Sequence, residues 1–322
     1  MRAILVSEYG DPAVLVPVDL PDPQAGTGEV LIQAEAVDTI YLETQIRGGW
    51  GEMFGVTLPY VPGGAAAGTI VSTGPGVSAS WLGRRVVAGP GTRGSYAELI
   101  RTGLDRLIPV PDDLDLRAAA ALGHDGVTAT AIIDGVGVKP GDRVLILGAA
   151  GGMGTLLVQL GHRLGAHVAG AARGEAKLAL VRRLGADVAV DYTGGSWIDE
   201  VRNAFGGLPV DVLLDGVGGT LGTEAFRLVA DGGRVSFHGA ASGDLATTDQ
   251  QSARARGIVV RGIADLQFEA PDLVRFATMA LAEAAAERIR PVIAREYPLS
   301  SAADAHRAME ARSIPGKALL IP

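Results

Sequence analysis

The sequence has no cysteine among its 322 residues. Disulfide bonds, thiolate nucleophiles and zinc sites built on cysteine are therefore excluded. It also has no uncharged apolar run near the roughly 18 residues that a membrane-spanning helix needs. The net charge is -8 and no concentrated cluster of lysine and arginine is visible, which argues against a nucleic-acid partner.

The rest of the composition is that of a globular protein, with 48% hydrophobic residues, 20% charged residues and 46 glycines. A length of 322 residues exceeds the size at which single cores stop growing, so we expect two domains. The apolar stretch within residues 1–8 is too short for a secretory signal peptide. We therefore expect a cytoplasmic protein with no membrane partner.

Short apolar runs broken by glycine and proline fill the first part of the chain, at residues 2–6, 29–34, 68–72, 84–88 and 94–100. This pattern predicts a β-rich, partly barrel-like domain. From about residue 116 the chain alternates strand-length apolar runs with helix-length segments, which predicts a parallel sheet covered by helices. We read the strands of that sheet at 143–147, 167–172, 188–191, 210–215, 233–237 and 258–262.

The last sixty or so residues return to a mixed pattern. An alanine-rich helix is expected near 273–288, and a final apolar run occupies 317–321. We expect this tail to rejoin the first domain. The predicted domains are therefore residues 1–119 with 263–322, and residues 120–262.

A predicted strand runs directly into a glycine-rich turn, and a helix follows it. Gly148, Gly151 and Gly154 allow a tight turn, a close approach of a pyrophosphate to the backbone, and close packing of the helix on the sheet. The unpaired N–H groups at the start of the helix bind phosphate. We therefore predict a dinucleotide site at Gly151, Gly152, Met153 and Gly154. The alternative is a plain tight turn in a glycine-rich chain.

The end of the second strand of the sheet distinguishes the two nicotinamide dinucleotides. An NAD site has an acidic residue there, which accepts hydrogen bonds from the ribose hydroxyls. This chain has Arg173 at that position and Lys177 one helical turn further, whereas Glu175 lies past the strand end. Two cations suit the 2′-phosphate of NADPH, so we predict NADPH as the cofactor. The alternative is that both are ordinary solvated side chains.

A series of motifs runs in order along nearly the whole chain: GDPAVL at 10–15, PGGAAAG at 62–68, GPGV at 74–77, GSYAE at 94–98, PGDRV at 140–144, LGAD at 184–187, DGVGG at 215–219 and GKAL at 316–319. Through this series the chain resembles the medium-chain dehydrogenase/reductase superfamily, in particular its quinone oxidoreductase branch. The resemblance implies an α/β fold, with a doubly wound parallel sheet (Rossmann) domain and a β-rich, partly barrel-like (GroES-like) catalytic domain.

Zinc-dependent members of that family carry a His-Glu pair where this chain has Gly64 and Ala65. The histidines do not pair at i, i+4 spacing; they are His124, His162, His167, His238 and His306. We therefore expect no metal. Alcohol oxidation near neutral pH needs a Lewis acid. A quinone or conjugated enone is already electrophilic and accepts hydride once it is held close and aligned.

The resemblance also implies cofactor contacts outside the glycine turn. These are Thr128, Tyr192 near the 2′-phosphate, Phe237, His238 and Gly239 beside the nicotinamide, and Lys317 from the returning tail. The alternatives are core packing for Thr128 and Phe237, and plain surface exposure for Tyr192 and Lys317.

One segment departs from the family pattern. Many relatives have an Asn three residues before an Asp, ahead of Arg-x-Gly, but residues 37–49 read VDTIYLETQIRGG. Either Asp38 takes the Asn position or the register slips. We expect the segment to line the nicotinamide pocket, with Tyr41 as the candidate catalytic donor to a developing oxyanion; the alternative is a tyrosine that only packs. Residues 50–54 fit either an apolar substrate lid or a dimer contact.

The sequence thus predicts an NADPH-dependent, zinc-free reductase that transfers hydride to a quinone or another conjugated carbonyl compound, in a cleft between its domains. One alternative is an enoyl-thioester or enone (alkenal) reductase of the same fold, and another is a non-catalytic NADPH-binding sensor. The substrate should be a small, apolar electrophile. We also expect a homodimer, because the strand at 258–262 would otherwise be an unpaired sheet edge.

Overall fold

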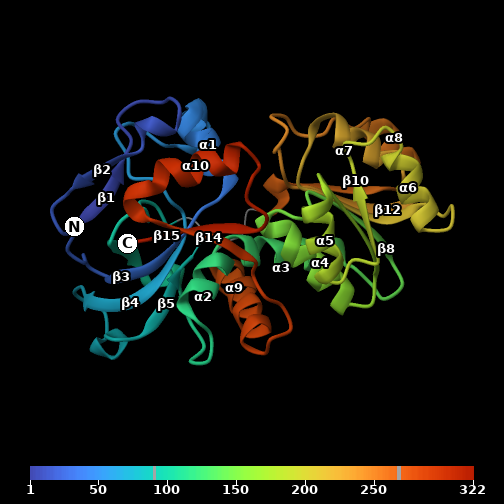
Figure 1. Cartoon of the computed structure of the whole chain (residues 1–322). Coiled ribbons are helices and arrows are strands. Elements are labelled where there is room, and N and C mark those ends of the chain that lie inside the picture. The colour runs from blue at the N-terminus through green and yellow to red at the C-terminus, as the bar shows by residue number, and fades with distance from the viewer. Residues whose placement is uncertain (90–91, 267–269) are drawn as a thin grey trace. The chain divides into compact units, whose positions relative to one another are not determined.

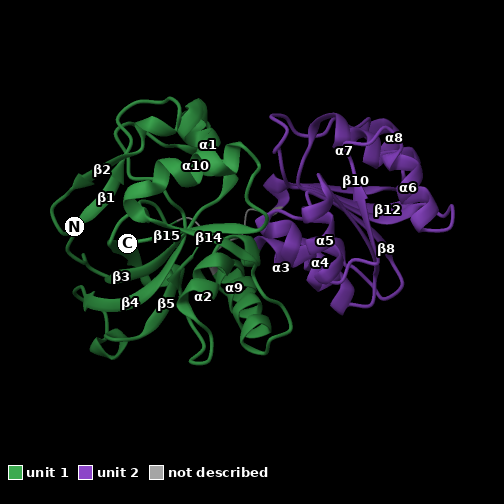
Figure 2. Cartoon of the chain, in the orientation of Figure 1, with its two compact units in different colours: residues 1–127, 268–322 green, residues 128–267 purple. Residues whose placement is uncertain are grey.

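The computed structural model describes residues 1–89, 92–266 and 270–322. The chain forms two compact units: unit 1 contains residues 1–127 and 268–322, and unit 2 contains residues 128–267 (Figure 2). The expected domain limits at 119/120 and 262/263 lie eight and five residues before these divisions, which fall at 127/128 and 267/268. Their role as the limits of independently folding domains stays a prediction.

Unit 2 contains a six-stranded sheet with the order β10-β9-β8-β11-β12-β13, parallel at every pairing (Figure 1). Its strands are β8 (Arg143–Leu147), β9 (His167–Ala172), β10 (Val188–Asp191), β11 (Val210–Asp215), β12 (Val229–Phe237) and β13 (Val259–Gly262). The strand order reverses between β8 and β11, which is the doubly wound Rossmann arrangement. The predicted fold of this part is confirmed.

The helices of this part are α3 (Asp125–Val136, which begins in unit 1), α4 (Gly152–Arg163), α5 (Glu175–Arg183), α6 (Trp197–Ala204), α7 (Gly219–Phe226) and α8 (Gln250–Ala255). Right-handed crossovers on the two sides of β8 place α4 and α5 on one face of the sheet and α7 and α8 on the other (Figure 1). Both faces are covered, which explains why the strands read as continuous apolar runs.

Glycine ends two of these helices at the expected places. Gly165 follows α4 and Gly185 follows α5, with φ angles of +77° and +105°, a backbone region that favours glycine. The strands between the helices fill the core of unit 2, where Leu145, Leu147 and Val235 are fully or almost fully buried. This packing fixes the carboxyl ends of the strands, where the predicted site residues lie.

Unit 1 is rich in β-structure. Its larger sheet has the order β14-β15-β3-β4-β5-β7, with β6 also paired to β3, and β1 pairs with β2 separately. The strands are β1 (Arg2–Leu5), β2 (Val16–Asp19), β3 (Glu29–Asp38), β4 (Ala66–Thr73), β5 (Arg85–Ala88), β6 (Leu99–Gly103), β7 (Leu107–Pro109), β14 (Ile293–Pro298) and β15 (Lys317–Ile321). Its helices are α1 (Tyr41–Gln45), α2 (Leu116–Leu122), α9 (Ala270–Ala285) and α10 (Ala302–Glu310).

The carboxyl-terminal strand β15 pairs antiparallel with β3, with Leu319 opposite Asp38. The predicted return of the tail to the first part of the chain is therefore confirmed. Ile32, Tyr96 and Leu320 lie in the apolar core of this unit. Across the described parts of the chain, no helix combines the length and apolarity needed to span a membrane.

Several predicted boundaries were displaced. The strand expected at 94–100 is β6, which begins only at Leu99, and β13 begins at Val259 instead of residue 258. Strand β12 begins at Val229 instead of residue 233, because Gly232 and Gly233 lie inside a strand whose pairing with β11 shifts register. Helix α4 begins at Gly152 instead of residue 155, since the glycines of the turn already adopt helical geometry. Helix α9 ends at Ala285 instead of residue 288, and Glu287 beyond it has a φ of +56°.

Candidate active site

The glycine turn lies between β8 and α4, at the carboxyl edge of the unit 2 sheet. Gly148 has a φ of +72°, and the N–H of Gly151 donates to its carbonyl oxygen at 2.9 Å. A Cβ on Gly154 would lie 2.2 Å from the same oxygen, so only glycine fits where the helix meets the turn. Gly151 is the N-cap and has no side chain to bond the first N–H groups of α4. The N-terminus of the helix can therefore accept a phosphate.

The predicted ligands of the 2′-phosphate meet at the ends of two neighbouring strands. Strands β9 and β10 end side by side, with Asp191 paired to Ala172. Arg173 follows β9 directly and is exposed, and Lys177 lies in the first turn of α5. Tyr192 follows β10, and its N–H donates to the Ala172 carbonyl at 3.3 Å. Two cations and one phenol are thus grouped at one place on the sheet edge.

The carboxylates near this group already have partners. Asp191 accepts hydrogen bonds from the Thr193 hydroxyl at 2.6 Å, the Thr193 N–H at 2.9 Å and the Gly174 N–H at 2.9 Å. These bonds lower the pKa of Asp191 and hold the loop that follows β9. Glu175 is exposed and accepts from Arg182 at 2.6 Å. Neither acid takes the position of a ribose-binding carboxylate after β9.

The ends of β11 and β12 approach each other closely. A Cβ on Gly239 would lie 2.2 Å from the Gly216 carbonyl oxygen, and the His238 N–H donates to the Asp215 carbonyl at 3.0 Å. The Asp215 side chain is buried, and burial raises its pKa although the following loop donates two N–H bonds to it at 2.8 and 2.9 Å. Phe237 is packed in the core. The predicted nicotinamide contacts therefore share one edge with the glycine turn.

Two other predicted site residues are engaged in packing. Thr128 is buried in α3 of unit 2. In unit 1, Tyr41 begins α1, and the guanidinium carbon of Arg312 lies 3.8 Å from the centroid of its ring, a cation–π contact. The role of Tyr41 as a donor stays a prediction. Met53 and Phe54 are exposed, which fits both the lid and the dimer contact expected for residues 50–54.

Lys317 is buried, so the alternative of plain surface exposure is wrong. Its Nζ lies 2.7 Å from Asp38 Oδ1 and 2.9 Å from Asp125 Oδ2, and donates to the Thr39 carbonyl at 3.0 Å. The approach to Asp38 is poorly aligned, and neither oxygen of that carboxyl makes a regular hydrogen bond. This buried network links β15, β3 and α3. A contact between Lys317 and the cofactor stays a prediction.

The two carboxyl groups of this network differ in their affinity for protons. Burial raises the pKa of Asp38 to about 7, against the opposing effect of the Lys317 charge. Burial acts on Asp125 in the same direction, but the charge of Lys317 and a hydrogen bond from His124 outweigh it and hold the pKa of Asp125 well below its usual range. Burial also opposes the charge on Lys317, but both carboxylates offset it and raise that pKa. Asp125 is therefore the ionised partner of the lysine.

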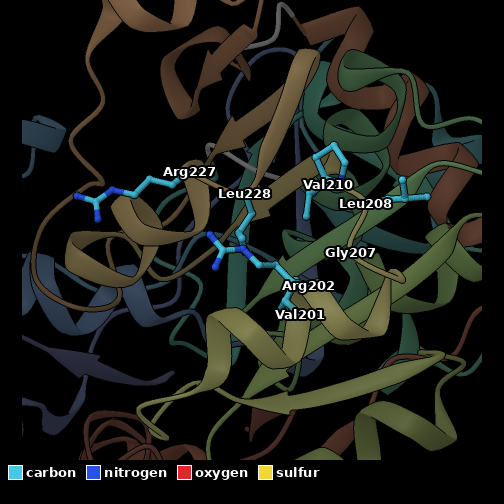
Figure 3. Close-up of a pocket in the computed structure, with 8 residues that line it drawn as sticks. Val201, Arg202, Gly207, Leu208, Val210, Arg227 and Leu228 are labelled. Carbon is cyan, nitrogen blue, oxygen red and sulfur yellow. The ribbon is translucent and has the colours of Figure 1, made fainter.

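One hollow of about 140 Å³ lies elsewhere in unit 2 (Figure 3). It is lined by the end of α6, the loop before β11 and the first residue of that strand, Val210. This is the amino edge of the sheet, opposite to the edge that carries the glycine turn. None of the predicted site residues lines this hollow, and it is too small for a dinucleotide.

Known proteins share both halves of this architecture. The family model "Alcohol dehydrogenase GroES-like domain" matches residues 26–112, and "Zinc-binding dehydrogenase" matches residues 152–277. The quinone oxidoreductase of Rattus norvegicus is 33% identical over 308 residues, covering 95% of this chain and 93% of the relative. The chain belongs to the quinone oxidoreductase branch of the medium-chain dehydrogenase/reductase superfamily.

Two further relatives of this quinone oxidoreductase-like chain carry names that refer to a cofactor in one case and to a substrate in the other. A mycobacterial protein solved in complex with NADPH superposes with a TM-score of 0.92 at 34% identity, covering 100% of both chains. The 2-haloacrylate reductase of a Burkholderia species is 30% identical over 330 residues, covering 100% of this chain and 99% of the relative.

The family includes zinc enzymes, but this quinone oxidoreductase-like chain offers few zinc ligands. Gly64 and Ala65 provide no ligand atom in their side chains, and a Cβ on Gly64 would lie 3.9 Å from Glu43 Oε1. Within residues 1–89, 92–266 and 270–322, no group of three or more histidines or acidic residues is placed to hold a metal ion. The sequence adds no cysteine.

Sequence reasoning missed the residues around Lys317 and the carboxyl group of Asp191. Their signal was weak, because an aspartate that ends a strand or begins a helix is common and its partner lies far away in the chain. The sequence predicted no role for His124, only that it lacks a histidine at i, i+4 spacing, whereas in the structure its Nδ1 lies 3.5 Å from Asp125 Oδ1. The position of Asp125 at the start of a helix, directly after a histidine, is the one local clue.

Proposed function

We propose that this protein is an NADPH-dependent, zinc-independent reductase that transfers hydride to a quinone or another conjugated carbonyl compound. The observation that carries the proposal is the grouping of Arg173, Lys177 and Tyr192 at the ends of β9 and β10, next along the sheet edge to the glycine turn after β8. Such a group suits a phosphate that NADPH has and NADH lacks. The NADPH complex of the mycobacterial relative supports this cofactor.

The residues at the sheet edge fit a dinucleotide. The close approach of α4 to its turn at Gly154 leaves the first N–H groups of the helix available to a pyrophosphate. The strand order reverses beside the same turn, where ligands of doubly wound sheets bind. We assign the cofactor contacts to Thr128, Gly151, Gly152, Met153, Gly154, Arg173, Lys177, Tyr192, Phe237, His238, Gly239 and Lys317.

NADPH supplies the hydride when it is bound. The protein's own part is then to hold an acceptor close and aligned, and to stabilise the charge that develops on the acceptor oxygen. We assign a hydrogen bond to that oxygen to the hydroxyl of Tyr41. A conjugated acceptor is electrophilic without a Lewis acid, so the glycine and alanine at positions 64 and 65 do not prevent this reaction.

A second candidate function is the reduction of an activated alkene, such as an enone or an enoyl thioester. The relative named 2-haloacrylate reductase, which the chain matches over its full length, favours it. The same cofactor residues would serve both reactions. The two differ in where the proton is added: a quinone receives it on oxygen, whereas an alkene receives it on carbon.

We also propose that the protein acts in the cytoplasm as a homodimer on a small apolar electrophile. The exposed apolar residues Val259 and Val260 on the edge strand β13 support the dimer, because an unpaired apolar edge invites pairing with another copy.

The test is oxidation of NADPH, followed at 340 nm, with quinones, enones and enoyl thioesters, and with NADH in parallel. We expect turnover with at least one acceptor class, a preference for NADPH, and no loss after treatment with a chelator. A preference for NADH would contradict the role of Arg173 and Lys177, and loss with a chelator would contradict zinc independence. Binding of NADPH without oxidation by any acceptor would favour the sensor.

A further inference from the structure

We propose that His124 is the general acid of this enzyme, which delivers a proton to the acceptor after hydride transfer, and that Asp125 is its positioning residue. The inference rests on the proposed function, because it needs an acceptor that takes up hydride. It concerns a different step from the hydrogen bond assigned to Tyr41, which stabilises charge without giving up a proton.

The contact between His124 and Asp125 gives the imidazole a defined orientation. His124 Nδ1 lies 3.5 Å from Asp125 Oδ1, at the long end of hydrogen-bond distances, and contacts of this length are common in catalytic sites without a bound ligand. The Nδ1 atom is fully enclosed, while 28% of the side chain is exposed. The exposed surface therefore belongs to the rest of the side chain. An imidazole held at Nδ1 by a carboxylate presents Nε2 to a reacting group.

Asp125 is itself held from its other side. Its Oδ2 lies 2.9 Å from the Nζ of Lys317, so one carboxylate bridges an ammonium and an imidazole. Lys317 in turn donates to the Thr39 carbonyl and lies beside Asp38. Buried ion pairs contribute little to stability, since the loss of hydration offsets their attraction. A fixed carboxylate next to a partly exposed histidine is better explained by the positioning of that histidine.

His124 interacts electrostatically with three carboxyl groups, and Lys317 interacts with two of these three. The four groups come from four elements. They are Asp38 on β3, Glu43 on α1, Asp125 on α3 and Lys317 on β15. Burial raises the pKa of both Asp38 and Glu43, so protons bind to these two carboxyls more readily than to ordinary ones. Lys317 and His124 keep Asp125 ionised. The carboxylate in contact with His124 is thus the one that can accept an Nδ1–H hydrogen bond.

The chain position of His124 is consistent with this role. It lies between α2 and α3, and α3 carries the chain from unit 1 into unit 2. Thr128, one of the cofactor contacts that we propose, follows His124 by four residues.

The reaction balances without another reactant. With an enone, the hydride forms a bond to the β-carbon, and the π electron pair of the C=C bond moves to give an enolate. The Nε2–H bond of the His124 imidazolium breaks, and its proton bonds to the α-carbon, which completes the saturated ketone. The neutral imidazole recovers a proton from water. With a quinone, the proton goes to oxygen, where water can also supply it.

The first test compares His124→Asn with His167→Asn, which changes an exposed histidine at the start of β9. We expect His124→Asn to lower kcat with an enone by roughly 100-fold, with KM for the acceptor changed by less than about threefold and a smaller loss with a quinone. His167→Asn should behave like the unaltered protein in each respect.

The second test does not depend on turnover. Long-range ¹H–¹⁵N spectra of the histidines, with His124 assigned from His124→Asn, report which ring nitrogen carries the proton in the neutral form. We expect Nδ1–H at His124 and a shift towards Nε2–H in Asp125→Asn, because the amide can donate to Nδ1. An Nε2–H tautomer in the unaltered protein, or an unchanged tautomer in Asp125→Asn, would overturn the role of Asp125.

The outcomes separate this inference from the proposed function. If the unaltered protein oxidises NADPH with none of the acceptors, the proposed function has failed. If it turns over an enone and His124→Asn retains full kcat, the general acid is not His124 and the proposed function stands. Circular dichroism melts of each variant identify a loss that comes from unfolding.

Discussion

At the scale of a single side chain, Arg173 is the residue that we propose distinguishes NADPH from NADH. It follows β9 and is exposed, and the nearby carboxylates of Asp191 and Glu175 already accept hydrogen bonds from Gly174 and Arg182. Truncation by Arg173→Ala should weaken NADPH binding by about 10- to 100-fold, since charge-assisted bonds contribute roughly 1.5–3 kcal/mol. NADH binding should change by less than about threefold, because it lacks the 2′-phosphate. Titration calorimetry with both dinucleotides measures the difference.

A matched control for Arg173 is available on the same helix. Arg183→Ala removes an exposed cation at the other end of α5, and it should leave the affinity for both dinucleotides unchanged. Equal losses of NADPH and NADH affinity in Arg173→Ala would mean that this side chain supports the fold of the loop and does not contact the 2′-phosphate.

A single side chain, Asp38, also makes the free energy of unfolding depend on pH. Its pKa is about 7 in the folded protein against an ordinary 3.8, so its protonation stabilises the fold fully below pH 3.8 and this contribution is lost as the pH rises through 7. Asp38→Asn removes that loss. We therefore expect the free energy of unfolding of the variant minus that of the unaltered protein to be larger at pH 8 than at pH 5, by a few kcal/mol.

Urea unfolding at pH 5 and pH 8 measures this difference. The control is Asp112→Asn, a change at an exposed carboxyl, which should give the same relative stability at both pH values. An Asp38→Asn effect that does not vary with pH would show that Asp38 is ionised throughout, and that Lys317 balances two carboxylates instead of one.

At the scale of an element, the junction between the glycine turn and α4 depends on the absence of a side chain at Gly154. A Cβ at position 154 would lie 2.2 Å from the Gly148 oxygen and 2.8 Å from the Ala149 Cα, and backbone atoms cannot rotate away. Gly154→Ala should therefore lower the free energy of unfolding by about 1–3 kcal/mol and weaken NADPH binding by about tenfold or more, because the start of α4 must move. Urea unfolding and calorimetry measure the two effects.

The control is Gly135→Ala, which introduces an alanine into a different helix, α3. Gly135 lies inside α3, and the nearest atom to a Cβ there is Arg261 Cδ at 4.0 Å. Alanine should fit and raise stability by about 0.5–1 kcal/mol through helix propensity, with no effect on NADPH. If Gly154→Ala were equally harmless, the close approach of α4 to the turn would not be required for binding.

Elements with one dominant local signal could be predicted from the sequence. The strands β8, β9, β10 and β11 were predicted at their observed limits, because strands buried on both faces give continuous apolar runs between glycines. Strand β12 was predicted too short, since two glycines indicated a turn where the structure has an irregular strand. Tertiary pairing overrode a local preference there.

The buried network could not be predicted in the same way. Lys317 and Asp125 lie 192 positions apart, and nothing in either local sequence indicates the other. A lysine in a final apolar strand suggests an exposed end. The cost of burying its charge is offset by two carboxyl groups and the Thr39 carbonyl, which the fold brings in from other parts of the chain. The grouping of Arg173, Lys177 and Tyr192 was predictable because all three follow strands of one parallel sheet.

At the scale of the whole molecule, β13 is an edge strand with a single strand partner among the described residues. It pairs with β12 on one side and ends the order of the unit 2 sheet. Val259, Val260 and Ile263 are all exposed there. Edge strands of stable monomers usually carry charges or prolines that prevent further pairing, whereas this strand is apolar apart from Arg261. A two-fold axis beside it would pair two copies of β13 antiparallel and cover these side chains.

The double change Val259→Lys, Val260→Lys should therefore convert a dimer into a monomer, because four additional charges would meet across a two-fold axis. Sedimentation velocity at several concentrations measures the state, and we expect the dissociation constant to rise by at least about tenfold. Val71→Lys, on an exposed position of β4, is the control and should remain dimeric. A monomeric unaltered protein would contradict the proposed dimer. A dimeric double variant would place the contact elsewhere, and the exposed Met53 and Phe54 would then be the next surface to change.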